Sequence, residues 1–575
     1  MLKKMIYTIF RKFIFISLFY SVLLSKFPDA IGYNGMVVSS NEYASNVGID
    51  ILKKGGNAID AAIGVSFALA VVHPGAGNIG GGGFMVIRTS DGKVSTIDFR
   101  EKAPSKASKD MFLDDSLNVI PGKSWSTSLA TGVPGSVAGM WLAHQKYGSV
   151  NWADIVRPSV KLAQYGFNLD PLNCSYLNSE YYKNLLSNDI EAKKIFTKST
   201  NFKIGETFIQ TDLANTLRRI AFNGYKGFYE GETAKNIVKC MDRTGGIISE
   251  QDLKNYKAIE RAPIEFDYNG YKVYSMPPPS SGGVALAGIL NQLENVNFDS
   301  ITYHSADYIH LIVEAERNVY ADRSVYLGDS DFNDIAIDEL ISDNYNNSRW
   351  NEVDLLNARK SNEVKEGNII YNESEETTHY SVVDKWGNAV SVTTTVNGWF
   401  GNGIVVDDSG FLLNNEMDDF SSKPGHPNKY GLVGNVLNSI EPNKRMLSSM
   451  SPTIVENPEG ELFLVVGSPG GSTIITTVAQ VILNVINQNM SIKDAVEQSR
   501  FHHQWLPDIV YFEPLNFSKE TLNSLKNMGH NLSYRRSIGE ANCIKIDYLD
   551  DLDKQKGYIF SGAADSRRGA SAKSY

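Results

Sequence analysis

Two adjacent threonines, Thr377 and Thr378, head a strand-like stretch in the middle of the chain (EETTHYSVVDKWGNAVSVTTTVN). A threonine hydroxyl is a weak nucleophile. It becomes reactive when threonine is the first residue of a chain, because its own α-amine then acts as the base. That amine has a pKa near ~8, so much of it can accept a proton at neutral pH. Thr377 gains such an amine only if the bond to Glu376 is cut first.

The segment before Thr377 bears on whether such a cut is plausible. Residues 346–376 are rich in Asn, Glu, Asp, Ser and Lys and show weak periodicity, so we expect an exposed segment that can move or be cut. Threonine is also a good strand residue and is common at strand heads, so an ordinary strand start is the simpler explanation of TTHYSV. From these residues alone both interpretations stay open.

Other motifs are less informative about chemistry. Residues 75–80 match G-x-G-x-x-G, but a helix and a proline precede them and a strand follows, which is the reverse of a dinucleotide site. Close packing of backbone is the better explanation of this glycine cluster. His502 and His503 are adjacent, so their side chains diverge, and no H-E-x-x-H motif accompanies them. We therefore predict structural roles for both histidines and no metal site.

The surrounding elements predict the fold class. Helices are expected over residues 42–54, 58–72 and 473–487. Two similar hairpins are expected over residues 84–100 and 380–396, each with a turn rich in Asp, Gly or Asn. Helices mixed with antiparallel hairpins favour an α+β layered fold over a doubly wound parallel sheet.

Two further segments have clear local signals. PPPSSGG (residues 277–283) is incompatible with regular structure and predicts a fixed loop. Residues 305–327 predict a long helix, with Ser305 as its N-cap.

Composition sets broad limits. The chain has 575 residues, 42% hydrophobic and 21% charged, which is ordinary for globular proteins and long enough for about two to four domains. The net charge of −10, without a long Lys/Arg cluster in the body, argues against nucleic acid as a partner. Three scattered cysteines form no disulfide framework, so we expect them to be ordinary buried residues.

The N-terminus has the pattern of a secretory signal. Basic residues between Lys3 and Lys12 precede an apolar run over residues 13–24, which is short for a membrane span. Ala30 is the plausible small residue at a cleavage site. The alternative is an N-terminal anchor that is not cleaved. We expect an exported protein, periplasmic or secreted.

The motif TTHYSVVD resembles the processing site of the gamma-glutamyltransferase (gamma-glutamyl transpeptidase) family of N-terminal nucleophile hydrolases. Seven further stretches and one histidine motif resemble family motifs, in family order, from about residue 35 to the end of the chain. The resemblance implies a four-layer α/β/β/α sandwich with two stacked, mainly antiparallel sheets. The motifs are GNAIDAAIGVSFALAVVHP, GNIGGGGF, DFREKAP, MPPPSSGG, LLNNEMDDFS, PNKRMLSSMSPTIV, GSPGGS and RFHHQWLP.

The resemblance also implies self-cleavage between Glu376 and Thr377. Residues 1–30 would be the signal peptide, residues 31–376 a large subunit and residues 377–575 a small subunit, held together as a non-covalent heterodimer. The implied reaction cleaves the gamma-glutamyl amide bond of glutathione and related compounds through a glutamyl ester on threonine. The glutamyl group then passes to water or to an amino acid or dipeptide acceptor. This chemistry needs no metal or organic cofactor.

Catalytic roles follow the matching positions of the family. Thr377 matches the nucleophile, and Thr395 matches a second threonine whose hydroxyl supports it. Gly470 and Gly471 match the pair that stabilises the oxyanion. Backbone N–H groups beside a helix start can face a developing negative charge, which agrees with this role.

Substrate recognition is implied for a free α-amino acid head group. Its α-carboxylate would bind an arginine, for which bidentate pairing is the natural geometry, and two serines. Its α-ammonium needs acceptors or negative charge. The matching residues are Arg100, Ser448 and Ser449 for the carboxylate and Asn397, Glu416 and Asp419 for the ammonium.

Residues 421–445 resemble the lid loop of bacterial members, and Tyr430 matches the tyrosine that covers the bound glutamyl group. Such a lid excludes water from the ester intermediate. Its length favours action on glutathione-like substrates. Alternatives are a cephalosporin-acylase-like amidase or a poly-gamma-glutamate depolymerase of the same fold, or an unprocessed binding relative. The retained carboxylate-binding residues and Asp419 favour a glutamyl head group.

Overall fold

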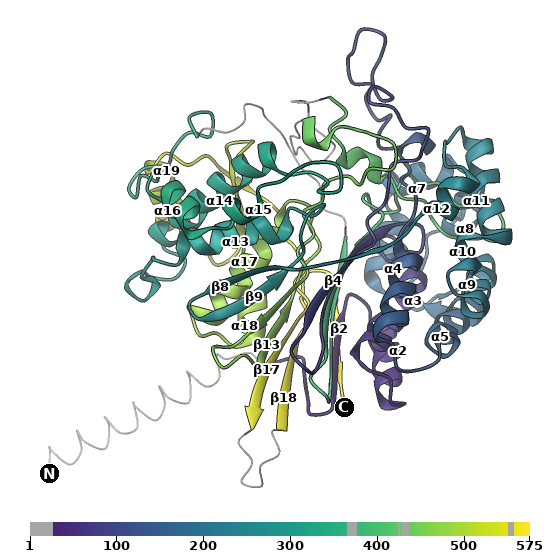
Figure 1. Cartoon of the computed structure of the whole chain (residues 1–575), viewed down its shortest axis with the longest axis horizontal. Helices are drawn as coiled ribbons and strands as arrows, with labels where there is room; N and C mark the ends of the chain where they lie inside the picture. Colours follow the sequence, from purple (N-terminus) through teal and green to yellow (C-terminus); the bar gives the residue numbers. More distant parts are fainter. Residues whose placement is uncertain (1–26, 365–376, 424–425, 427–435, 550–556) are drawn as a thin grey trace, which may run out of the picture.

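The structure is a computed structural model that describes residues 27–364, 377–423, 426, 436–549 and 557–575. Within these residues two seven-stranded sheets stack face to face, and helices cover both outer faces (Figure 1). The arrangement is the predicted four-layer α/β/β/α sandwich, so the α+β assignment is confirmed.

The first sheet contains both predicted hairpins. Its strand order is β19-β2-β10-β11-β3-β4-β7, and every neighbouring pair is antiparallel. Hairpin β3–β4 lies beside hairpin β10–β11 through the β3–β11 pairing. The strands are β2 (Gly35–Ser39), β3 (Gly82–Arg88), β4 (Val94–Asp98), β7 (Ile259–Arg261), β10 (Thr378–Asp384), β11 (Ala389–Thr395) and β19 (Ser571–Ser574).

The second sheet has the order β1-β18-β17-β13-β12-β9-β8 and is also antiparallel. Its strands are β1 (Ala30–Gly32), β8 (Ile264–Tyr268), β9 (Tyr271–Ser275), β12 (Thr453–Glu456), β13 (Leu462–Val466), β17 (Cys543–Leu549) and β18 (Gly557–Ala563). Two small sheets lie outside it, formed by β14 (Phe501–His502), β15 (Val510–Phe512) and β16 (Leu532–Tyr534), and by β5 (Phe167–Asn168) and β6 (Thr207–Phe208).

Side chains that alternate along each strand pack into two different apolar cores, one on each face of the sheet. In β2, Met36 and Val38 belong to the apolar cluster between the sheets, whereas Val37 belongs to the cluster under the helices. Successive side chains of a strand point to opposite faces, so one short strand supports two cores. The cluster between the sheets also takes Val86 from β3 and Ile454 from β12.

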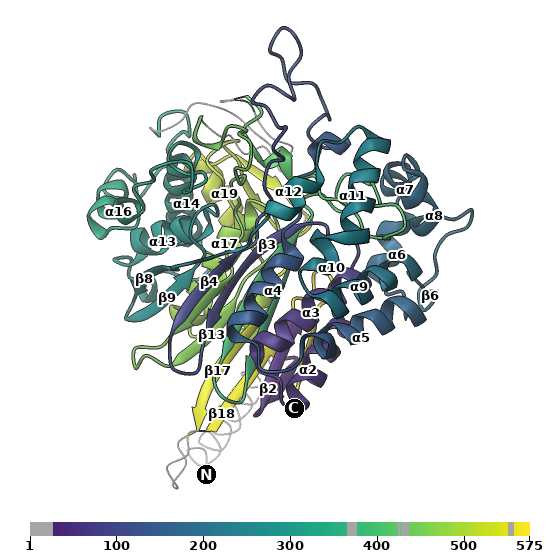
Figure 2. The same cartoon turned by 45° about the vertical axis from the view of Figure 1, so that its right-hand side comes forward.

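Helices from the first half of the chain cover the first sheet (Figure 2). Every residue of α3 is buried, as its apolar sequence predicts, and Asn57 closes a capping box at its start. These helices are α2 (Glu42–Lys53), α3 (Ala58–Val72), α4 (Ser136–Tyr147), α5 (Trp152–Tyr165), α6 (Pro171–Asn178), α7 (Glu180–Ser187), α8 (Ile190–Phe196), α9 (Thr211–Asn223), α10 (Lys226–Tyr229), α11 (Gly231–Thr244) and α12 (Glu250–Asn255).

The second sheet is covered by a separate group of helices (Figure 1). The predicted long helix is α14, and the Ser305 side chain accepts a hydrogen bond from the backbone of Tyr308, as expected of a cap. The group is α13 (Gly282–Leu293), α14 (Ala306–Tyr326), α15 (Ile337–Leu340), α16 (Asp343–Trp350), α17 (Thr473–Ile486), α18 (Ile492–Glu497) and α19 (Lys519–Asn527).

Both sheets mix strands from the two sides of the predicted cleavage point. In the first sheet β10 and β11 lie between β2 and β3, and in the second sheet β12 and β13 lie between β9 and β17. A cut after residue 376 would therefore leave each core built from both pieces.

The prediction of an exposed segment over residues 346–376 is wrong for part of it. Helix α16 extends to Trp350, and Ser361 is fully buried. Trp505 donates its indole N–H to the Ser361 carbonyl, and Asp508 accepts the Ser361 backbone N–H. The polar composition here supplies internal hydrogen bonds, which composition alone cannot distinguish from contacts with solvent. Residues 365–376 lie outside the described residues.

The cysteine prediction is confirmed, because Cys174, Cys240 and Cys543 are free and buried. The apolar run of the predicted signal lies outside the described residues. Among the residues that are described, no helix has both the length and the apolar character needed to cross a membrane.

Candidate active site

The β10–β11 register brings two threonines together. Thr378 pairs with Thr394, so one residue further along Thr377 stands opposite Thr395. Both threonines are buried and both line the same cavity. The hairpin therefore places a second hydroxyl beside the predicted nucleophile.

A glycine turn from the second sheet meets Thr377. Gly470 donates its backbone N–H to the Thr377 Oγ1 over 2.9 Å. The φ angles of Gly470 and Gly471 are +134° and +56°, which other residues rarely adopt, and α17 begins two residues later at Thr473. This turn holds peptide N–H groups at a helix start beside the hydroxyl, as an oxyanion site requires.

The glycine cluster before β3 packs against the same hairpin end. A Cβ at Gly81 would lie 2.0 Å from the Thr395 carbonyl oxygen, and Asn78 donates to that oxygen over 2.8 Å. The cluster thus allows close backbone approach, as predicted. The Thr395 hydroxyl accepts the backbone N–H of Asn397 over 2.7 Å, which fixes it at the edge of the cavity.

Arg100 is buried and lines the same cavity. Its guanidinium donates to the carboxylates of Glu416 and Asp419, and to the carbonyl oxygens of Met446 and Leu447 at 3.3 and 3.2 Å. The arginine predicted for an α-carboxylate and the two acids predicted for an α-ammonium therefore form one ion cluster.

A third carboxylate, from Glu101, belongs to this cluster. It lies 3.8 Å from Arg100, is fully buried, and accepts no hydrogen bond from the described residues. Burial raises the pKa of Glu101 to about 8, and burial also raises the pKa of Glu416 well above its usual value. Burial thus disfavours the ionised form of these two carboxyl groups, and a cation beside them would favour it. Glu101 was not predicted from the sequence. The one sign of it there is its position directly after Arg100 in the DFRE motif.

The PPPSSGG loop fixes the two predicted serines. Ser281 donates both its backbone N–H and its hydroxyl to the Ser448 carbonyl, at 2.7 and 2.6 Å. The Ser448 N–H returns a hydrogen bond to the Pro279 carbonyl at 2.9 Å, and the Ser280 hydroxyl donates to the Met450 carbonyl at 2.6 Å. These contacts order the loop, as predicted, and hold Ser448 and Ser449 at the cavity wall. The prediction is wrong for the end of the motif, because Gly282 and Gly283 are the first two residues of α13.

The structure gathers the predicted residues around one cavity, and Tyr430 alone among them lies outside the described residues. Gly470 joins the group through its contact with Thr377. The cavity is also lined by Arg323, Leu447, Met450 and Ile474, which sequence reasoning did not single out. The predicted residues that line it are Arg100, Thr377, Thr395, Asn397, Glu416, Asp419, Ser448, Ser449 and Gly471.

Comparison with known proteins agrees with this geometry. The sequence profile described as Gamma-glutamyltranspeptidase matches residues 44–575. The chain belongs to the gamma-glutamyltranspeptidase family. It is 48% identical over 528 residues to a glutathione hydrolase proenzyme of Escherichia coli (strain K12), covering 92% of this chain and 90% of that protein. A glutathione hydrolase proenzyme of Bacillus subtilis (strain 168) is 38% identical over 560 residues, with 94% and 92% covered.

Solved structures show the same relationship. The crystal structure of Helicobacter pylori gamma-glutamyltranspeptidase is 44% identical with a TM-score of 0.56, and the match covers 57% of this chain and 94% of that one. A cephalosporin acylase from Bacillus halodurans shares the fold, with a TM-score of 0.79, 24% identity, and 96% and 97% covered.

The RFHHQWLP motif of this transpeptidase-family chain lies behind the cavity wall. His502 is hydrogen-bonded to Thr476 through Nδ1, at 2.9 Å, and to Ser472 and Gln504 through Nε2, at 3.2 and 2.9 Å. Burial lowers the pKa of His502 to about 3, so it stays neutral. Its contacts brace the start of α17, which agrees with the predicted structural role.

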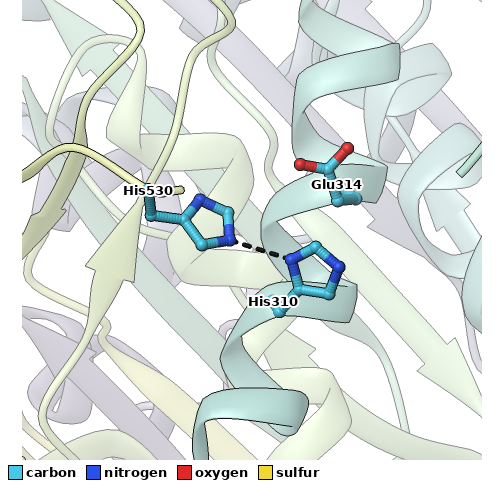
Figure 3. Close-up of side chains that lie close together, drawn as sticks. All are labelled: His310, Glu314 and His530. Carbon is cyan, nitrogen blue, oxygen red and sulfur yellow. Dashed lines mark hydrogen bonds between the residues drawn. The ribbon is translucent and has the colours of Figure 1, made fainter. Parts of the chain in front are cut away.

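Three other side chains lie close enough together to hold a metal ion: His310, Glu314 and His530 (Figure 3). His310 already uses both ring nitrogens, with His530 Nε2 and the Asp354 carbonyl, each at 2.8 Å. Both Glu314 carboxylate oxygens accept from arginines, Arg317 at 3.0 Å and Arg359 at 2.7 Å. A cation here would displace these bonds and face two guanidinium groups, so we assign the cluster to packing between α14 and the loop after α19.

Proposed function

We propose that this chain is a gamma-glutamyltransferase and glutathione hydrolase that matures by cutting itself between Glu376 and Thr377. The observation that carries the proposal is the 2.9 Å hydrogen bond from the Gly470 N–H to the Thr377 hydroxyl. Thr377 lines a cavity that is also lined by Arg100. A nucleophile, an oxyanion donor and an ion cluster for an amino acid head group thus lie on one cavity. The glutathione hydrolase relatives support the same activity.

Maturation would use the same hydroxyl. The Thr377 Oγ1 attacks the Glu376 carbonyl carbon, the peptide C–N bond breaks, and the nitrogen takes up the proton to become the α-amine of Thr377. Water then hydrolyses the resulting ester and leaves Glu376 as a free carboxylate. The products, residues 31–376 and 377–575, would stay together because both sheets combine strands from the two pieces. The word proenzyme in the relatives' names supports this step. The H. pylori chain also supports it, because nearly all of that chain matches only 57% of this one.

Turnover would follow with the freed amine as base. The amine takes the proton of the Thr377 hydroxyl while Oγ1 attacks the γ-carbonyl of the substrate. The N–H groups of Gly470 and Gly471 hold the negative charge that develops on the carbonyl oxygen. The amine then returns the proton to the leaving nitrogen, and a glutamyl ester remains on Thr377. Water, or the amino group of an amino acid or dipeptide acceptor, releases the glutamyl group by attack on this ester.

The ion cluster would recognise the glutamyl head group. Arg100 with Ser448 and Ser449 binds the α-carboxylate, while the oxygens of Asn397, Glu416 and Asp419 surround the α-ammonium. The buried carboxylates support this assignment, because a cation beside them favours their ionised form. The lid over residues 421–445, with Tyr430 closing over the glutamyl group, is part of the proposal.

A pair of substrates separates this function from the amidase alternative. A γ-glutamyl anilide carries the α-ammonium, whereas a glutaryl anilide has the same chain and carboxylate without it. Three carboxylates beside Arg100 favour the cationic head group. We expect release of the anilide from the γ-glutamyl compound to be about a hundredfold more efficient. Preference for the glutaryl compound would support a cephalosporin-acylase-like activity, and an intact chain without turnover would indicate a binding relative.

Export through the N-terminal signal is part of the proposal, and the structure bears on where the signal ends. Asp29 accepts hydrogen bonds from the Lys493 ammonium and the Ala564 backbone N–H, each at 2.8 Å. Removal of residues 1–30 would delete both contacts. N-terminal sequencing of the exported large subunit would distinguish a cut after Ala30 from one before Asp29.

A further inference from the structure

Arg323 is a buried cation on the cavity wall. It lies in the last turn of α14, its exposed fraction is 4%, and it lines the cavity together with Thr377 and Ser449. Its guanidinium donates to the Ser449 hydroxyl through Nη2 over 3.0 Å and to the Ser281 hydroxyl through Nε over 2.8 Å. Arg323 therefore contacts both Ser449 and the PPPSSGG loop, which holds Ser448 and Ser449 in place.

Hydrogen bonds within the protein set the direction in which the hydroxyls of Ser448 and Ser449 can donate. A guanidinium only donates, so the Ser449 oxygen accepts from Arg323 and its own proton must point elsewhere. The Ser448 oxygen likewise accepts the Met450 backbone N–H over 3.2 Å. Both hydroxyls are thereby left to donate to a group in the cavity. Two such donors on one wall suit an anion.

The charged residues that line the cavity also favour an anion-binding role for Arg323. Arg100 is bonded to Glu416 and Asp419 and lies 3.8 Å from Glu101, so carboxylates of the protein already surround its positive charge. An incoming carboxylate beside Arg100 needs further positive charge and further donors. Arg323 supplies the charge directly behind Ser449.

We propose that Arg323 is a specificity-determining positioning residue, which turns the Ser449 hydroxyl toward the substrate α-carboxylate and supplies the second positive charge for it. This inference rests on the proposed function, because it concerns the head group of a γ-glutamyl substrate. Arg323 would act through Ser449 on binding and leave the threonine chemistry unchanged.

The test compares two substrates that differ only in the α-carboxylate, γ-glutamyl-p-nitroanilide and 4-aminobutyryl-p-nitroanilide. For the γ-glutamyl substrate, we expect Arg323→Gln to raise KM about 10- to 100-fold with kcat little changed, the range for loss of a charge-assisted contact. For the 4-aminobutyryl substrate kcat/KM should stay within about twofold of wild type. Arg323→Lys keeps the charge and loses the forked geometry, so its effect should lie between wild type and Arg323→Gln.

A matched control lies on the same helix. Arg317 is also buried and donates to Glu314 and Asp508, but it does not line the cavity. Arg317→Gln should lower the melting temperature and leave the ratio of kcat/KM for the two substrates unchanged. A purely structural role of Arg323 predicts the same behaviour for Arg323→Gln, and an unchanged ratio in that variant would overturn the inference.

Two outcomes must be kept apart. If the wild type turns over neither substrate, the proposed function fails and the inference falls with it. If the wild type is active but Arg323→Gln does not fold or mature, the test is the ratio of kcat/KM for the two substrates in Arg323→Lys, compared with wild type. A shift of its substrate ratio toward the 4-aminobutyryl compound supports the inference, and a wild-type ratio overturns it.

Discussion

Gly470 donates its backbone N–H to the Thr377 hydroxyl, although 93 residues separate them in the chain. Thr377 precedes β10 of the first sheet, and Gly470 follows β13 of the second. The contact forms only because the two sheets stack. The site is thus a property of the whole sandwich, with the proposed nucleophile next to one sheet and the proposed oxyanion donor next to the other.

Gly470→Ala should reduce turnover through this contact. The φ of +134° strains any side chain, and the new Cβ would lie 2.3 Å from the Thr473 Oγ1, so the turn must shift its N–H away from Thr377. Loss of one oxyanion donor lowers kcat about 10²- to 10³-fold. Steady-state kinetics with a γ-glutamyl anilide would measure this. Gly460→Ala is the control, since Gly460 also has a positive φ, of +77°, but a Cβ there meets nothing within 4 Å. Equal losses in both variants would remove Gly470 from the mechanism.

Arg100→Ala should weaken substrate capture while self-cleavage continues. The guanidinium donates to Glu416 and Asp419, and among the described residues it makes no hydrogen bond to Thr377 or Gly470. We expect KM for a γ-glutamyl anilide to rise about 100-fold. The free energy of unfolding should also fall by roughly 3–5 kcal/mol, because buried carboxylates lose their cation.

Gel analysis of the two subunits, together with KM and thermal melting, checks the Arg100 prediction. Arg100→Lys, which keeps a cation, should retain more stability than Arg100→Ala. Cleaved Arg100→Ala enzyme with an unchanged KM would exclude Arg100 from substrate binding.

Glu101 should make stability depend on pH. Burial raises the pKa of its carboxyl from 4.5 to about 8, so the folded chain binds this proton more tightly than the unfolded chain does. The stabilisation is complete below about pH 4.5 and is lost as pH rises to about 8. Glu101→Gln cannot titrate and should lack this loss. Melting temperatures across this range should fall more steeply for wild type than for Glu101→Gln. Parallel curves would contradict the assignment, and the exposed variant Glu459→Gln should follow wild type.

The sequence predicted which residues lie around the cavity better than it predicted which charged groups are buried there and contact one another. The strand pattern around Thr377 and Thr395 specifies a hairpin, and its register alone sets the two hydroxyls opposite each other. The loop over residues 277–281 follows from its composition, because proline excludes regular structure. The structure confirms the hairpin and this loop, but Gly282 and Gly283, which were also expected in the loop, begin α13.

Relationships across the fold were not predictable in this way. Glu101 and Arg323 read as ordinary charged residues in sequence, since a charge gives no local sign that it is buried. Their burial depends on elements that are distant in the chain: Glu101 lies near Glu416, 315 residues away, and Arg323 donates to Ser449, 126 residues away. Ser361 was expected to be exposed for the same reason, and its partner Asp508 lies 147 residues away.

The central claim is that Thr377 becomes a chain terminus. The most direct measurement is intact mass with N-terminal sequencing of the purified wild type beside Thr377→Ala, with Thr378→Val as a neighbouring control. We predict a fragment of residues 377–575 that begins Thr-Thr-His-Tyr in the wild type, the corresponding fragment in Thr378→Val, and one uncut, inactive chain in Thr377→Ala. Two normal subunits in Thr377→Ala would contradict the account, because cleavage would then need no Thr377 hydroxyl.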